Sequence, residues 1–330
     1  MKKSGIWLLL CVLLISGIGL SLSTGTISLS VEELVAVIRG QGPPANQLVV
    51  LDFRLPRMLI AIFAGAGLAV SGYLFQTITH NDLADPGILG INAGAGLTVL
   101  FYLGFFTSQT SSSLLPFVAC IGSFLAAFLV YFCSKQKERF DPNRLLLSGV
   151  AVNAGISALT LIGTIRISQD SYLFVTSWLA GTIWGTTWNH VYVILPWLFI
   201  LLPFILFQGK SLEVIGLGDE EAVGLGVPLK KKQLFFLTSA VILAAVSVSV
   251  AGSISFIGLI APHLAKIIVE RKNNHALLMT GVIGSLLLLY SDILGRIILA
   301  NGEMAAGIIV SIVGAPYFIF RLLKNNQSKS

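Results

Sequence analysis

Charged residues are scarce in this chain. They make up 11% of its 330 residues, whereas 55% of the residues are hydrophobic. Soluble globular proteins carry about 25% charged residues, so this composition excludes an ordinary soluble protein. No stretch is polar enough to form a separate soluble domain. We therefore expect a single membrane-embedded domain over residues 1–330.

Nucleotide-binding and catalytic motifs are also lacking. The run Gly209-Lys210-Ser211 ends like a phosphate-binding P-loop, but that motif needs a glycine at position 204, which is Phe204 here. The sequence has no His-Glu-x-x-His zinc motif and no Gly-x-Ser-x-Gly nucleophile elbow. We therefore expect that the chain is not an enzyme and has no ATPase site of its own.

Metal-ligating residues are few and scattered. The three cysteines, Cys11, Cys120 and Cys133, all lie in apolar runs. Neither their spacing nor that of the four histidines matches a metal site. We interpret the cysteines as small hydrophobic residues and the histidines as residues at the ends of spans, and we expect no cofactor.

Long apolar runs are what the chain has in abundance. A helix that crosses a bilayer needs about 20 apolar residues, and these runs lack the alternation of transmembrane β-strands. The pattern predicts an all-α, polytopic membrane helical bundle with about ten transmembrane helices. The predicted spans are 6–22, 57–78, 88–106, 114–134, 145–165, 191–208, 233–251, 254–270, 276–298 and 305–323.

The net charge of +6 is explained by topology. If both termini are cytoplasmic, most lysines and arginines fall in inside connections, as the positive-inside rule requires. The loop 209–232 then also lies inside. The charge therefore predicts a multi-pass protein of the cell membrane and gives no reason to expect a nucleic-acid partner. The run after Met1-Lys2-Lys3 also begins like a signal peptide, but no clear cleavage site follows, so we expect a retained helix.

Two segments outside the spans have features of their own. Residues 31–38 form an amphipathic pattern after Ser30, which predicts a short helix on the surface of the bundle. Residues 167–190 hold three of the five tryptophans and are too short to span, which predicts an interfacial or re-entrant helix on the outer side.

The segment from Arg54 to Ala95, which contains the second predicted span and the start of the third, carries the most specific motif. Arg54-Leu55-Pro56-Arg57 precedes a run rich in small residues, which allow helix backbones to approach closely in lipid. Phe75-Gln76, Asn81–Pro86 and Leu89–Ala95 follow. This pattern resembles the signature region of the iron-siderophore and vitamin B12 (FecCD-type) family of ABC-importer permeases. Asp82 stands where that family usually has proline.

The resemblance implies a fold and a set of partners. It covers about residues 50–320 and implies the type II (BtuC-like) ABC-importer permease fold. The family's permeases work in pairs, so a second copy or a close paralogue is expected. An extracytoplasmic substrate-binding protein delivers the cargo, and an ABC ATPase dimer drives transport. The implied cargo is an iron(III)-siderophore, ahead of haem or cobalamin.

Loop 209–232 has the composition of an ordered segment, which favours a docking element over a flexible tether. Its Leu-Gly-x-x-x-Ala-x-x-Leu-Gly run, residues 217–226, resembles the coupling helices that contact the ATPase in that family. A second family motif ends at Pro262-His263, which is either a helix end near the coupling region or only a packing kink. The residues proposed for ATPase coupling are Asp219, Glu220, Glu221, Ala222, Gly224, Gly226, Pro262 and His263.

Three arginines map to the outer surface against the positive-inside bias. Arg54, Arg57 and Arg296 either anchor helix ends by snorkelling or, as the resemblance implies, dock acidic residues of the binding protein. Asp292 and Arg296 are four residues apart and share a helix face, so they can pair. Other charges within spans are nearly absent, which disfavours the alternative of an ion- or proton-coupled carrier acting alone.

Overall fold

The computed structural model describes residues 3–25, 28–105, 114–135, 141–269, 273–299 and 302–327, and within these ranges every regular element is a helix. The elements are α1 Lys3–Ser23, α2 Val31–Ile38, α3 Pro44–Gln47, the π-helix η1 Leu48–Arg54, α4 Leu55–Thr79, the 3-10 helix η2 Pro86–Leu89, α5 Ile91–Phe105, α6 Leu115–Ser134, α7 Pro142–Thr164, α8 Gln169–Leu179, α9 Trp188–Phe207, α10 Gly209–Leu217, α11 Asp219–Gly224, α12 Leu229–Ala251, α13 Ile257–Val269, α14 Asn273–Ile297 and α15 Ala306–Gln327.

The predicted all-helical membrane bundle is confirmed. Seven stretches of the described chain are long and apolar enough to cross a membrane, and three shorter apolar helices accompany them. Each of the ten predicted spans falls on one of these helices. The three shorter helices are α5, α13 and most of α15, and the first two begin about three residues later than predicted.

Helix α4 lies at the centre of the larger helix group, packed against α9, α12, α13 and α14. Glycines make these crossings close. A Cβ atom on Gly65 would overlap the backbone of Gly284 in α14, and one on Gly72 would overlap the backbone of Gly258 in α13. Close backbone approach is how helices gain packing energy in lipid, where burial of apolar surface offers no advantage. The density of small residues in the sequence is thereby explained.

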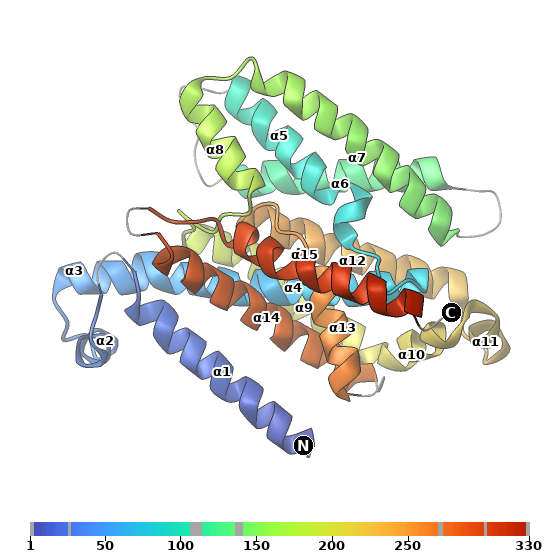
Figure 1. The fold of residues 1–330 in the computed structure, drawn as a ribbon, viewed down its shortest axis with the longest axis horizontal. Coiled ribbons are helices and arrows are strands. Elements are labelled where there is room, and N and C mark those ends of the chain that lie inside the picture. The colour runs from blue at the N-terminus through green and yellow to red at the C-terminus, as the bar shows by residue number, and fades with distance from the viewer. Residues whose placement is uncertain are drawn as a thin grey trace.

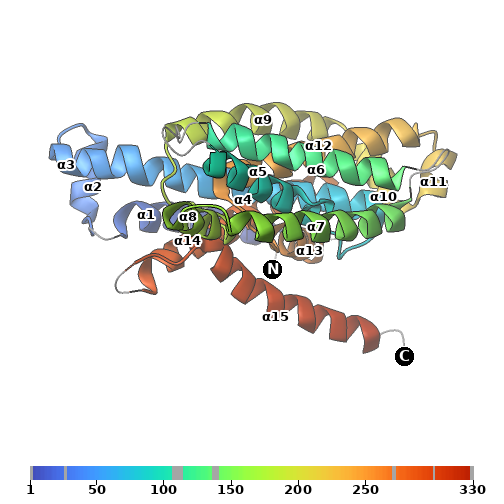
Figure 2. The ribbon, with the colours of Figure 1, turned by 90° about the horizontal axis from the view of Figure 1, so that it is seen from above.

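Helices α5, α6 and α7 form a second group, which lies above the first in Figure 1. Helix α12 connects the groups by packing against both α4 and α6. Helix α1 packs against α14 and α4 but buries little of its own surface. Helix α15 extends away from the main layer towards the C-terminus, as Figure 2 shows.

Most of the short helices gather at the two ends of the long axis. In Figure 1, α2 and α3 lie at one end, α10 and α11 lie at the other, and α8 lies beside α5 in the upper group. Helix α2 has the predicted bounds and a reciprocal capping box between Ser30 and Glu33. The helix predicted within 167–190 is α8, which Ser168 caps. Loop 209–232 is the ordered element that its composition predicts.

Candidate functional site

The end of the molecule that is predicted to face the cytoplasm presents a small apolar surface on α10 and α11. Ala222 is fully buried and fixes α11 to the bundle. Around it Leu217 is 65% exposed, Val223 60% and Leu225 65%. We call these three residues, with Gly224 between them, the coupling surface. Exposed large apolar side chains gathered outside the predicted spans are typical of a protein contact site.

Glycines leave the coupling surface open. Neither Gly224 nor Gly226 has any atom within 4 Å of the position where a Cβ would stand. Gly226 has a φ of +80°, which favours glycine because side chains strain that conformation. Gly224 has no such constraint. Glu220 and Glu221 are exposed beside these glycines, so the surface combines apolar and acidic groups.

Asp219 ties α11 to two spans. Its Oδ1 atom accepts a hydrogen bond of 3.0 Å from Gln233 Nε2 in α12. The same oxygen lies 3.2 Å from His80 Nε2, at the end of α4. His80 closes α4 in the left-handed conformation, with a φ of 50°. These two contacts link α11 to α4 and α12.

Pro262 and His263 lie within α13, away from α10 and α11 in the sequence. Both are buried, and α13 continues through Pro262 as a helix. The His263 ring hydrogen-bonds the Tyr317 hydroxyl of α15, with the two rings edge to face at 5.7 Å. These contacts favour the packing role for this pair, and its coupling role stays a prediction.

A cationic link that the sequence did not indicate joins α13 to the turn after α4. Lys266 Nζ donates to Asp82 Oδ1 at 2.7 Å and to Gln76 Oε1 at 3.1 Å. It also lies over the Tyr73 ring, 5.5 Å from the centroid. Asp82, the residue that departs from the family pattern, thus has a specific partner. Its separation of 184 residues from Lys266 leaves no local sequence signal.

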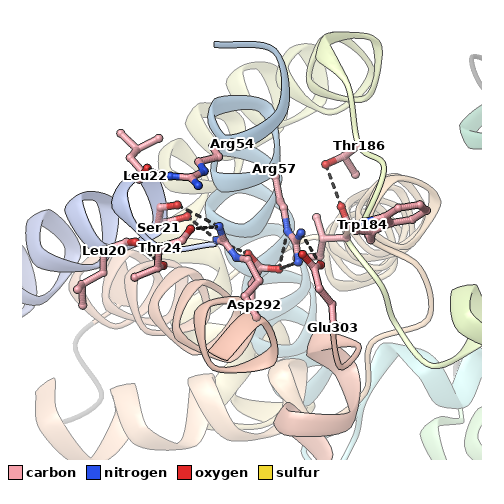
Figure 3. A network of polar contacts seen from close by, with 12 residues as sticks. Leu20, Ser21, Leu22, Thr24, Arg54, Arg57, Trp184, Thr186, Asp292 and Glu303 are labelled. Atoms are coloured by element: carbon pink, nitrogen blue, oxygen red, sulfur yellow. Dashed lines mark hydrogen bonds and ion pairs between the residues drawn. The ribbon is translucent and has the colours of Figure 1, made fainter. Parts of the chain in front are cut away.

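The outer arginines form an ionic cluster inside the protein, shown in Figure 3. Arg57 in α4 lies 2.7 Å from Asp292 in α14 and 2.7 Å from Glu303. Arg296 lies 2.6 Å from the other Asp292 oxygen, which gives the pair that the four-residue spacing indicates. The Asp292 side chain is 1% exposed. This carboxylate is therefore held between two guanidinium groups.

The remaining arginine contacts join this cluster to the end of α1. Arg54 is 6% exposed and donates to the Leu22 carbonyl at 2.6 Å. Arg296 donates to the Ser21 carbonyl at 3.0 Å and to its hydroxyl at 2.7 Å. The three arginines thus hold α1, α4 and α14 together at the end of the molecule that is predicted to lie outside. Their role in docking a binding protein stays a prediction, and substitution of any of them would also remove these internal contacts.

Among the described residues, no group of three or more His, Cys, Asp or Glu side chains is arranged to hold a metal ion.

Comparisons with known proteins agree with this arrangement. Residues 12–324 match the model of the FecCD transport family. The chain is 41% identical over 313 residues to the iron(3+)-hydroxamate import system permease of Bacillus subtilis (strain 168), covering 93% of each. It is 33% identical over 286 residues to the Fe(3+) dicitrate transport system permease protein FecC of Escherichia coli (strain K12), covering 86% of each.

The fold is also that of a solved transporter. The chain superposes on a metal-chelate type ABC transporter in an inward-facing conformation with a TM-score of 0.82 and 28% identity, over 97% of this chain and 99% of that one.

Proposed function

This chain is a member of the FecCD transport family, and on that premise we propose that it carries an iron(III) chelate inward with energy from a separate ATPase. It is a multi-pass permease of the cytoplasmic membrane. The proposal concerns the direction of transport, the partners and the role of each surface.

The coupling surface is the observation that carries the proposal. A lone carrier has no need for exposed leucine and valine side chains on two ordered helices at one end of the molecule. An ATPase that docks there would bury Leu217, Val223 and Leu225. Ties from Asp219 to His80 and Gln233 would then pass its movement to α4 and α12.

The other partners follow from the remaining surfaces. Helices α7 and α15 present rows of exposed apolar side chains, of which Leu147 at 72% and Ile312 at 62% are examples. We assign this face to a second copy of the permease or a close paralogue. The outer end, with Arg54, Arg57 and Arg296, receives the substrate-binding protein. The cargo class is an iron(III)-siderophore, as the names of the relatives indicate.

Reconstitution tests the proposal. The permease, purified from its native membrane with its associated subunits, is placed in proteoliposomes with radioactive iron(III) trihydroxamate outside. Uptake should need ATP at the coupling-surface side and should persist when a proton ionophore abolishes the pH gradient. Uptake by the permease alone, abolished by the ionophore, would instead establish the alternative of a proton-coupled carrier.

A further inference from the structure

Two non-helical or short-helical segments, residues 80–90 and 252–256, meet halfway through the bundle. After α4 ends at Thr79, the chain turns back over 80–90 before α5 begins. A Cβ on Gly258, at the start of α13, would lie 3.0 Å from Asp85 Oδ2 and 3.1 Å from the Leu68 carbonyl oxygen. Leu68 is near the middle of α4, so the Asp85 carboxylate lies at the same depth. Irregular backbone at this depth is tolerated only where protein or a water-filled cavity surrounds it.

These segments line a polar groove of about 410 Å³ between α5, α7 and the segment 252–256. Its polar lining residues are Asp85, Asn92, Asn153, Ser157, Ser253 and Ser255. A second recess of about 400 Å³ shares Ser253 and Ser255 with it and extends along α15 to Ser311. The groove thus runs along the face between α7 and α15, which is otherwise apolar.

Asp85 gives this groove a negative charge. Its Oδ1 accepts a 2.7 Å hydrogen bond from the Gly87 backbone N–H, and the carboxylate borders the open space. The other polar groups in the lining are amides and hydroxyls, and no lining residue is cationic. Intramembrane carboxylates are costly, and as a rule they mark a substrate or ion pathway.

We propose that this groove contacts the iron chelate during its passage and that Asp85 selects cargo by charge, admitting cationic and neutral chelates over anionic ones. The inference rests on the proposed transport function. Amide and hydroxyl groups suit the oxygen-rich surface of a chelate, whereas the carboxylate repels one that carries surplus negative charge. A negatively charged ferric citrate complex is therefore a poor cargo, and a trihydroxamate complex is a good one.

The test uses three probes with the same iron-binding part and different terminal charges. They are one linear iron(III) trihydroxamate with a free terminal amine, its acetylated form and its succinylated form, which are cationic, neutral and anionic. ATP-dependent uptake is measured for the wild type and for Asp85→Asn. The amide keeps the oxygen that accepts from Gly87, so the local turn is preserved while the charge is removed.

In the wild type the cationic probe should enter faster than the anionic one. Asp85→Asn should raise the ratio of anionic to cationic uptake by at least about fivefold, the Coulomb effect of one charge at contact distance in water. Asp85→Glu, which keeps the charge, should keep the wild-type ratio. Because wild type and variants use the same binding protein, its own preference cancels in the change of this ratio.

An unchanged ratio in Asp85→Asn would overturn the charge filter, as would equal loss of all three probes in both Asp85 variants, which would show a structural role. Absence of ATP-dependent uptake of any probe by the wild type would instead contradict the proposed function. The two failures are therefore distinguishable.

Discussion

The variant Gly224→Arg tests the role of the coupling surface without disturbing the fold of the permease. Gly224 ends α11 and has open space where a side chain would stand, so arginine meets no atom of this chain. Replacement of a helical glycine favours the helix by at most about 1 kcal/mol. The isolated permease should therefore unfold at the same temperature or slightly higher. An added side chain in a packed interface costs about 1–3 kcal/mol, which weakens ATPase docking about 5- to 150-fold.

The assay compares thermal unfolding of the purified permease with ATPase retention during purification and with ATP-dependent uptake. Gly224→Ala is the matched control, because a single methyl group fits in the same space and should leave docking near the wild-type level. Gly226→Ala is a contrast, because its φ of +80° makes a side chain strained and lowers stability of the permease itself. Normal ATPase retention and uptake by Gly224→Arg would refute the coupling role of α11.

Three further outcomes are expected. Arg57→Ala leaves the buried Asp292 carboxylate with one partner fewer and should cost about 3–5 kcal/mol, measured by thermal unfolding in detergent, whereas a mere lipid anchor would cost far less. Gly72→Ala forces α4 away from Gly258 and should lower the unfolding temperature, which a silent substitution would contradict. Hydrogen bonds from its cap lower the pKa of Glu33 below 4.5, so α2 keeps this stabilisation above that pH. Its amide hydrogen exchange should therefore accelerate as the pH falls through the lowered pKa, and an exchange profile independent of pH after correction for intrinsic rates would contradict this.

The sequence predicts the spans because hydropathy acts locally. Each apolar run of sufficient length forms a helix that satisfies its own backbone, whatever lies beside it. The same locality explains the short helices. Ser30 and Glu33 carry a complete capping box within four residues, so the predicted bounds of α2 are confirmed.

Long-range pairing is what the sequence could not reveal. Arg57 and Asp292 are 235 residues apart, and no periodicity indicates that one faces the other. The Arg296–Asp292 pair follows from helix spacing, whereas the contact of Arg57 with the same carboxylate does not. The sequence shows Asp85 only as part of a motif, because hydropathy does not reveal that the segment after α4 returns to the depth of Leu68.

The glycine crossings of α4 have a consequence for how the bundle responds to heat. Ordering a long side chain costs up to about 2 kcal/mol in lost rotamer entropy, whereas glycine has no rotamers to lose. Where Gly65 meets Gly284 and Gly72 meets Gly258, the contact is made by backbone that is already fixed within helices. Warming therefore has little side-chain freedom to release at these crossings. Helices α4, α13 and α14 should keep their mutual distances at temperatures where α1, with most of its surface outside the bundle, has already separated.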